Sequence, residues 1–402
     1  MKNKFHAFTE AATLWLIIFA SACIVLPTAF MSLATGLFVI FWLLSGNYKQ
    51  KFTSISQNPA AVATIALFAL YAIGTLYSSA SWDYSLIFLS KYGKLLLIPL
   101  IISVLHSDKH REYALNAFVF GMITVLIISW LMWLGVVPHH EDLGQGYYVF
   151  KGRIAHNIFL AFAMYLMMHK ALNSAKPERY IWMALSILSA LNILFLVNGR
   201  TGQIIMLVLI TWFIYEVWGV KKLAYFIIFG LLSFTLLQVT HKLPHSRLTD
   251  VQQEAKGGVS TSVGQRVEMY KNTLSLILKH PTIGGGTGSL KNEYDSLVKD
   301  KNLELGNVTN PHNQILLTTQ ELGIVGLALL TLMWVLHWQT SYKITRLEYS
   351  IALRGLVITI VIGSLFNSLL LDASEGKFYC ILAGVLLSAF IRQPQTENPL
   401  QH

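Results

Sequence analysis

Residues 309–323 read TNPHNQILLTTQELG and mark the point where the one long polar segment of the chain returns to apolar sequence. That polar segment runs from about residue 241 to residue 312, and apolar runs occupy most of the remaining sequence. Asn310 suits the N-cap of a helix, and Pro311 suits the first helical position. We therefore predict that a helix begins here, with His312 and Asn313 in its first turn.

A histidine in the first turn of a helix lies at the positive end of the helix dipole, which disfavours the imidazolium. His312 should therefore stay neutral and able to accept a proton. The unpaired N–H groups of the same turn could also hold an anion. These two properties make the junction a candidate reactive centre.

Composition places the chain among polytopic membrane proteins. It has 402 residues, of which 54% are hydrophobic and 12% charged, and its mean hydropathy is +0.54. A span needs roughly 20 apolar residues. We predict an all-α protein with about twelve spans, or eleven because the first two runs are divided only by Pro27. The apolar runs lie near residues 11–28, 30–45, 60–77, 92–106, 114–137, 154–169, 180–198, 202–219, 222–240, 312–338, 350–371 and 376–391.

The distribution of lysine and arginine orients these spans. One set of tails and loops carries most of the Lys and Arg, so the positive-inside rule makes that set cytoplasmic. Both termini are then inside. Residues 1–240 form nine spans, residues 241–311 a helical segment on the outer face, and residues 312–402 three spans and a tail, all in one integrated domain. The formal charge of +10 is mostly this topology signal, so we expect no nucleic-acid partner.

The few Lys and Arg residues on the outer side run against the positive-inside rule, so each needs an explanation. Lys91 and Lys94 are three residues apart and share a helix face, while Arg153 and His156 are one helical turn apart. Each pair either anchors a helix in the headgroup region or contacts a phosphate. Arg200 lies in a tight turn between two spans, where a charge costs up to about 3 kcal/mol unless it faces a cavity or partner. We therefore favour a functional role for Arg200 over one in which its side chain simply reaches the membrane surface.

The outer segment has its own helical pattern. Ser262 and Gln265 fit a capping box, and apolar residues then repeat every three to four positions over 263–277. This predicts an amphipathic helix that ends near Lys279 and lies on the membrane surface or on the membrane domain. Arg266 lies near the N-terminal end of this helix, where the dipole is unfavourable for a cation, so capping does not explain it.

Other polar features carry both structural and functional interpretations. We favour a plain turn for the glycine-rich residues 284–289, because they lack the lysine of a phosphate-binding loop. Glu321, well inside a predicted span, should face the protein interior. Asp372 and Glu375 either cap a helix or orient one of the outer cations. The run at 139–142, His-His-Glu-Asp, has the spacing of a solvated loop rather than a metal site, and we expect no metal ligands in the chain.

Four motifs in this order resemble the O-antigen ligase family over roughly residues 150–390. They are Arg200-Thr201-Gly202 after an apolar span, Arg266 ahead of His280-Pro281-x-x-Gly284-x-Gly286, Pro311-His312-Asn313-x-x-Leu316 with Glu321-x-Gly323, and Asn367-Ser368 before Asp372-x-x-Glu375-Gly376. The first 150 residues match only in being apolar.

This resemblance implies a bacterial inner-membrane glycosyltransferase of the C type (GT-C). Such ligases transfer O-antigen polysaccharide from undecaprenyl diphosphate to the outer-core sugar of lipid A–core on the periplasmic side. They resemble inverting enzymes, and they need no metal or other cofactor. The family's essential arginines and histidine carry over to Arg200, Arg266 and His312. O-antigen polymerases and protein O-oligosaccharyltransferases share this C-terminal region, so the acceptor stays open.

The chemistry of these residue types agrees with that class. Diphosphate is a good leaving group, and fixed guanidiniums stabilise the charge that develops on it. A sugar hydroxyl needs a base, which a neutral histidine supplies. Our hypothesis makes Arg200, Arg266 and His312 catalytic, and the candidate substrate contacts are Lys91, Lys94, Arg153, His156, Asn313, Asp372 and Glu375. The alternative from another class is a twelve-span transporter of anionic lipids, although no broken-helix repeat supports it.

Overall fold

The computed structural model describes residues 2–138, 146–239, 262–301 and 307–390. Within these ranges the chain is helical apart from loops and one isolated β-bridge between Gly146 and Val197. This confirms the predicted all-α polytopic class. The first helices are α1 (Lys2–Cys23), α2 (Thr28–Leu44), α3 (Tyr48–Ser56), α4 (Pro59–Gly74), α5 (Trp82–Tyr92), η1 (Gly93–Leu96), α6 (Leu97–Ile102) and α7 (Asp108–Trp133). They are followed by α8 (Arg153–Asn173), α9 (Glu178–Leu191), η3 (Asn192–Leu196), α10 (Arg200–Val239), α12 (Ser262–Lys279), α13 (Leu290–Lys301), α14 (Gln314–Ser341), α15 (Leu347–Ser364) and α16 (Ala373–Leu387).

The number of spans differs from the twelve that we predicted. In the described part of the chain, seven helices are long and apolar enough to cross a membrane, or up to eight if α2 and α3, bent by 116°, form one span. Two predicted spans fall within α10, whose backbone leaves the helical conformation at Gly219 (φ 75°, ψ 179°), between them. Two others form helices of only 16 residues (α4) and 15 residues (α16), short of the roughly 20 that a span needs. Apolar sequence therefore overstated the number of complete spans.

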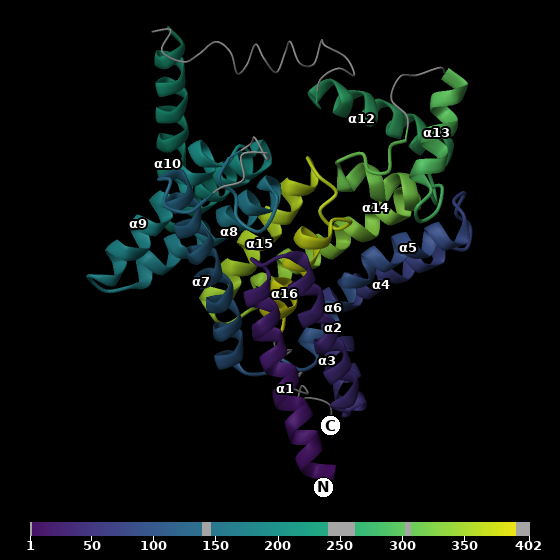
Figure 1. Ribbon diagram of the computed structural model, residues 1–402, viewed down its shortest axis with the longest axis horizontal. Coiled ribbons are helices and arrows are strands. Elements are labelled where there is room, and N and C mark those ends of the chain that lie inside the picture. Colours follow the sequence, from purple (N-terminus) through teal and green to yellow (C-terminus); the bar gives the residue numbers. More distant parts are fainter. Residues whose placement is uncertain (1, 139–145, 240–261, 302–306, 391–402) are drawn as a thin grey trace, which may run out of the picture.

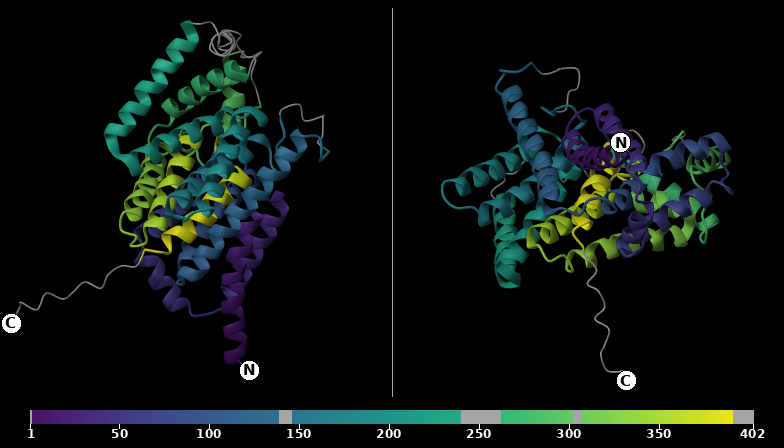
Figure 2. Two further views of the ribbon diagram at one scale, coloured as in Figure 1. Left: turned by 90° about the vertical axis from the view of Figure 1, so that its left-hand side faces the viewer. Right: turned by 90° about the horizontal axis from the view of Figure 1, so that it is seen from below.

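Helix α16 lies at the centre of the molecule (Figures 1 and 2). It packs against α1, α2, α6, α7, α8, α14 and α15. From Phe378 to Leu387 every residue of α16 is buried, because this stretch is apolar all round rather than on one face. The loops at its two ends therefore lie where many helices meet.

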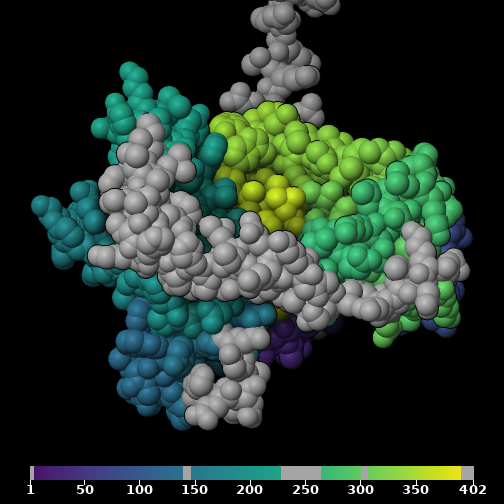
Figure 3. All heavy atoms as spheres, turned by 90° about the horizontal axis from the view of Figure 1, so that it is seen from above, coloured from purple at the N-terminus to yellow at the C-terminus, as the bar shows by residue number. Residues whose placement is uncertain are grey.

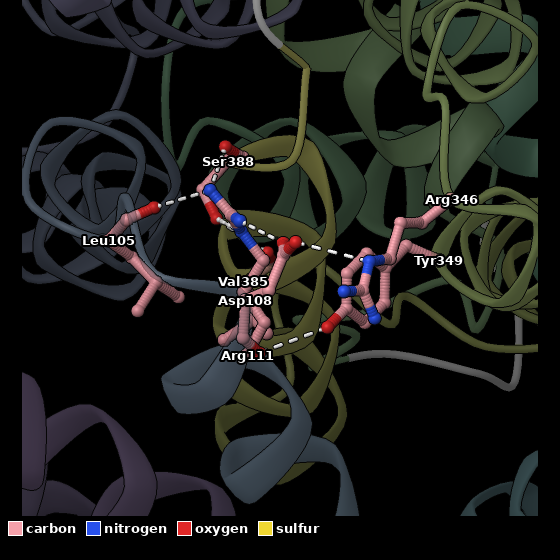
Figure 4. A network of polar contacts seen from close by, with 7 residues as sticks. All are labelled: Leu105, Asp108, Arg111, Arg346, Tyr349, Val385 and Ser388. Atoms are coloured by element: carbon pink, nitrogen blue, oxygen red, sulfur yellow. Dashed lines mark hydrogen bonds and ion pairs between the residues drawn. The ribbon is translucent and has the colours of Figure 1, made fainter.

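The C-terminal end of α16 is held by a buried arginine on α7 (Figure 4). Arg111 is 3% exposed and donates to the Ser388 hydroxyl at 2.9 Å, the Ser388 carbonyl at 2.6 Å and the Leu105 carbonyl at 2.9 Å. It also pairs with Asp108 at 2.5 Å, and Asp108 pairs with Arg346 at 3.1 Å. One guanidinium thus joins the ends of α6, α7 and α16.

Helices α12 and α13 pack on α14, at the opposite end of the molecule from the start of α1 (Figures 1 and 2). The predicted amphipathic helix is confirmed, because α12 ends at Lys279. Its packed face differs from the predicted stripe. Met269 and Leu276 are buried, whereas Val267 and Leu274 are 39% and 51% exposed.

The glycine-rich turn is a structural joint, as we favoured. Helix α14 breaks at Gly323, whose φ is 63°, and the break frees backbone groups on both sides. The carbonyls of Gln320 and Glu321 accept from the N–H groups of Gly285 and Gly286 at 2.9 and 2.8 Å. In return, the N–H of Ile324 donates to the Pro281 carbonyl at 2.8 Å. The N–H groups of this turn are therefore used within the protein.

Glu321 faces the protein interior, as predicted. One carboxylate oxygen accepts from the Gly288 N–H at 2.8 Å, and the other accepts from the Tyr92 hydroxyl at 3.0 Å. This fully buried side chain therefore fastens the glycine-rich turn and α5 to α14.

Candidate functional site

The helix after the polar segment begins three residues later than we predicted. Asn313, not Asn310, is the N-cap of α14, and its side chain accepts from the N–H groups of Ile315 and Leu316 at 3.0 and 3.1 Å. The Asn310 side chain instead accepts from the His312 N–H at 2.8 Å. His312 therefore lies just outside the helix, and its φ of 53° places it in the left-handed region. That conformation is uncommon for residues other than glycine and often marks a functional position.

His312 is held on both sides of its backbone. Its N–H donates to Asn310, and its carbonyl accepts from the Tyr270 hydroxyl of α12 at 3.2 Å. Burial, and then the positive charge of Arg266, lower the pKa of His312 below its usual value of 6.5. This direction agrees with the expectation of a neutral imidazole, and its causes are desolvation and a nearby guanidinium.

The loop between α15 and α16, residues 365–372, joins several outer elements. The Leu365 carbonyl accepts from the Asn313 side chain at 3.0 Å, and the Ser368 hydroxyl donates to Asn310 at 2.7 Å. The Asn367 side chain donates to the hydroxyl of Thr201, the residue after Arg200, at 3.1 Å. Seen from above, yellow residues of the C-terminal part of the chain surface between teal α10 and green α12 (Figure 3). The 365–372 loop therefore links the start of α10 to the His312 segment.

Arg200 and Arg153 begin the neighbouring helices α10 and α8. The turn before Arg200 packs tightly on α8, since the Asn157 side chain donates to the Val197 carbonyl at 3.0 Å. A Cβ at Gly202 would lie 2.3 Å from the Asn157 Cβ. Only glycine allows this approach, so it sets the position of Arg200 against α8.

The structure gives His156 a role within the protein. It is 1% exposed, and one ring nitrogen lies 3.1 Å from the Asn192 side-chain oxygen of η3. The other ring nitrogen accepts from the Val149 N–H at 3.4 Å. His156 therefore fastens α8 to η3 and the preceding loop, and its nitrogens are already engaged.

A cavity of about 670 Å³ lies between α2, the α5–η1 segment, the loop before α14 and the start of α16. Both predicted lysines line it. Lys94 is buried, and its ammonium donates to the carbonyls of Leu371 and Asp372 at 3.0 and 2.6 Å. The lining residues are Ser32, Thr35, Gly36, Val39, Phe88, Ser90, Lys91, Gly93, Lys94, Leu97, Thr309, Asn310, Leu371, Asp372, Ala373 and Lys377.

Lys377 is one of the few outer-side cations in the sequence, but we did not include it among the candidate substrate contacts. Its ammonium donates to the Ser32 hydroxyl of α2 at 2.6 Å, and it lines the cavity with Lys91 and Lys94. Its position on the outer side was the sequence signal that pointed to it.

The acids of this region face the lysines. Burial raises the pKa of Asp372 to about 6, and the charges that oppose this rise are Lys94 and Lys91. Asp372 occupies the N-cap position of α16 without a side-chain capping bond, and Glu375 is buried in the first turn. Among the described residues, no group of three or more His, Cys, Asp or Glu side chains could hold a metal ion. Residues 139–142 lie outside that part of the chain.

Residues 184–331 match the family model for O-antigen ligase. The chain carries an O-antigen ligase family domain. This confirms the family that the motifs predicted, and the matched range includes Arg200, Arg266 and His312. The apolar helices indicate a membrane protein, and the family that residues 184–331 match is a family of enzymes. No curated protein matches the chain.

Proposed function

We propose that the protein is an inverting, metal-independent glycosyltransferase. It transfers O-antigen polysaccharide from undecaprenyl diphosphate to the outer-core sugar of lipid A–core. The observation that carries this proposal is a half-buried histidine whose pKa is lowered by burial and by the charge of Arg266, beside the loop that holds the start of α10. The family match supplies the reaction class.

In this mechanism the acceptor hydroxyl attacks the anomeric carbon of the donor sugar. A carbon–oxygen bond forms there as the bond to the diphosphate oxygen breaks. The hydroxyl proton passes to the imidazole of His312, and the leaving diphosphate keeps the electron pair. Arg200 and Arg266 stabilise the charge on that diphosphate, because guanidiniums bind phosphate oxygens in pairs and stay charged.

The backbone of His312 favours its role as base. Hydrogen bonds from Tyr270 and to Asn310 hold the residue in a left-handed conformation. Its imidazole is thus positioned before substrates bind, and pre-organisation of this kind lowers a reaction barrier. Its lowered pKa keeps it unprotonated at neutral pH.

The proposal places the protein in the bacterial inner membrane with α12 and α13 on the periplasmic side. Both termini are then cytoplasmic. Residues 1–240 and 312–402 form the membrane body, and residues 241–311 form the periplasmic segment. Both substrates are amphiphiles, so each reaches a site at the membrane surface from the bilayer. No metal or other cofactor is required, because protein cations serve the diphosphate.

The test is complementation of a ligase-null strain by His312→Asn. Asparagine tolerates the left-handed region, so this variant keeps the backbone and removes the base. We expect polymer attachment to fall by about 10²- to 10⁴-fold. The matched control is His280→Ala, since His280 is exposed at the end of α12. Normal attachment by well-expressed His312→Asn would show that His312 is not the base.

A second experiment separates the alternatives. Purified protein in detergent receives the polyprenyl-linked donor and lipid A–core, and the product is analysed by mass spectrometry. A ligase makes a covalent glycan–lipid A product without any vesicle. A polymerase lengthens the donor glycan instead, a protein O-oligosaccharyltransferase requires a protein acceptor, and a transporter makes no covalent product.

A further inference from the structure

The cavity beside α2 is polar at one end and apolar at the other. Along α2 its wall runs from Ser32 to Val39, and along the opposite wall it runs from Lys91 to Leu97. At 1.5 Å per helical residue, the first wall is roughly 10 Å long. Such a slot matches an amphiphile, with its charged head among the lysines and the first part of its hydrocarbon below.

Three lysines provide the positive charge of the polar end. Lys91 is exposed, with its ammonium 4.2 Å from the centroid of the Phe88 ring, whereas Lys377 contacts the Ser32 hydroxyl. Lys94 binds two carbonyls. In the described part of the chain, none of these three ammonium groups forms an ion pair with a carboxylate. Their charge is therefore available to an anionic ligand.

One carboxylate, Asp372, lines the same cavity. It would repel a bare diphosphate but can accept a hydrogen bond from a sugar hydroxyl. The hydroxyl groups of Ser32 and Thr35 add further hydrogen-bonding groups suited to a sugar. The lining thus combines positive charge for phosphate with neutral and acidic groups for a sugar.

The cavity also connects directly to the candidate reactive centre. Asn310 lines it, and the same side chain accepts from the His312 N–H at 2.8 Å. A ligand in the slot therefore lies against the segment that holds the histidine.

We propose that this cavity binds the phosphorylated sugar head of the acceptor glycolipid. The inference rests on the proposed function, in which two amphiphiles must meet. The donor diphosphate is bonded to the transferred sugar, so it has to lie at the reaction centre with Arg200 and Arg266. The slot beside Asn310 then serves the second amphiphile.

Two variants test the slot from different helices, α2 and α16. Nothing lies within 4 Å of a Cβ built at Gly36, so Gly36→Phe extends into open space in the slot without changing its charge. Lys377→Met removes one charge and keeps the side-chain length. The matched control is Lys299→Met, because Lys299 is exposed on α13 and away from the cavity lining.

The measurement is equilibrium binding to the purified full chain in detergent, without transfer. The probes are phosphorylated lipid A, dephosphorylated lipid A and undecaprenyl diphosphate. We expect the wild type to prefer phosphorylated over dephosphorylated lipid A by about tenfold or more, since each charge-assisted contact contributes on that scale. Gly36→Phe and Lys377→Met should weaken lipid A binding at least tenfold and leave undecaprenyl diphosphate binding unchanged. The control Lys299→Met should leave the binding of both lipids unchanged.

Equal wild-type binding of the two lipid A forms would overturn the proposal without any variant. So would a selective loss of undecaprenyl diphosphate binding in Gly36→Phe, which would assign the slot to the donor. The proposed function can fail separately. If the wild-type protein binds lipid A in this cavity but makes no glycan–lipid A product, the binding proposal stands and the ligase reaction is refuted.

Discussion

The contact between Gly202 and Asn157 provides a direct test of how the site is positioned. In Gly202→Ala the new Cβ would lie 2.3 Å from the Asn157 Cβ and 3.0 Å from the carbonyl carbon of the same residue. Backbone atoms cannot rotate away, so α8 and α10 would have to separate by about 1 Å to restore ordinary contact. The start of α10, with Arg200, would move by a similar amount.

This displacement leads to two expected magnitudes. Overpacking costs about 1–3 kcal/mol of stability, partly offset by roughly 1 kcal/mol because alanine favours helix over glycine. A misplacement of about 1 Å reduces a positioned reaction by roughly 10²-fold, so activity should fall far more than stability.

The assay compares glycan transfer and thermal unfolding of purified Gly202→Ala in detergent. The control is Gly121→Ala in α7, where the nearest atoms to the new Cβ are the two methyl groups of Val25 at 3.0 and 3.2 Å. We expect near-normal transfer by that control. If Gly202→Ala transferred glycan at the wild-type rate and its melting temperature were unchanged, the close approach of Gly202 to Asn157 would not set the position of Arg200.

Three further predictions concern proton transfer and buried polar groups. Because burial and Arg266 lower the pKa of His312 from 6.5, kcat/KM should decline on the acid side at a lower pH than an ordinary imidazole would give. Residual activity of Arg266→Met should decline at a higher pH than wild type. Glu321→Leu strands two buried donors and should cost about 1–3 kcal/mol for each, measured by chemical unfolding in detergent. Arg354→Met leaves the Glu216 carboxylate without its 2.7 Å partner and should destabilise by about 3–5 kcal/mol, and adding Glu216→Leu should restore part of that loss.

Local sequence signals predicted the outer helices well. The capping box and apolar period located α12, and the glycine-rich run correctly indicated a plain turn. The start of α14 was misplaced, because Asn310 and Asn313 are both good caps. Only the tertiary contact of Asn310 with Ser368 shows why the second one serves. Span counting failed for a different reason: hydropathy detects apolar runs but not how long the helices in them are, and the apolar runs of α4 and α16 form helices of only 16 and 15 residues.

The candidate site was only partly predictable. His312 was chosen for its place at a predicted helix start and Arg266 for its unfavourable place near a helix N-terminus, and the charge of Arg266 does influence His312. The cavity has no signature in the sequence, because its walls come from α2, α5 and the start of α16, far apart along the chain. The contacts of His156 could not be predicted from local spacing. His156 was paired with Arg153 by helical spacing, but Asn192, which engages it, lies on another helix.

The joint between the glycine-rich turn and α14 is made largely of main-chain hydrogen bonds. Main-chain groups are the same whichever side chains surround them. Exposed positions on α12 and α13 can therefore vary in sequence while these main-chain hydrogen bonds keep the helices in the same position on α14. Substitution of the glycines, by contrast, would loosen the outer helices without touching any reacting group.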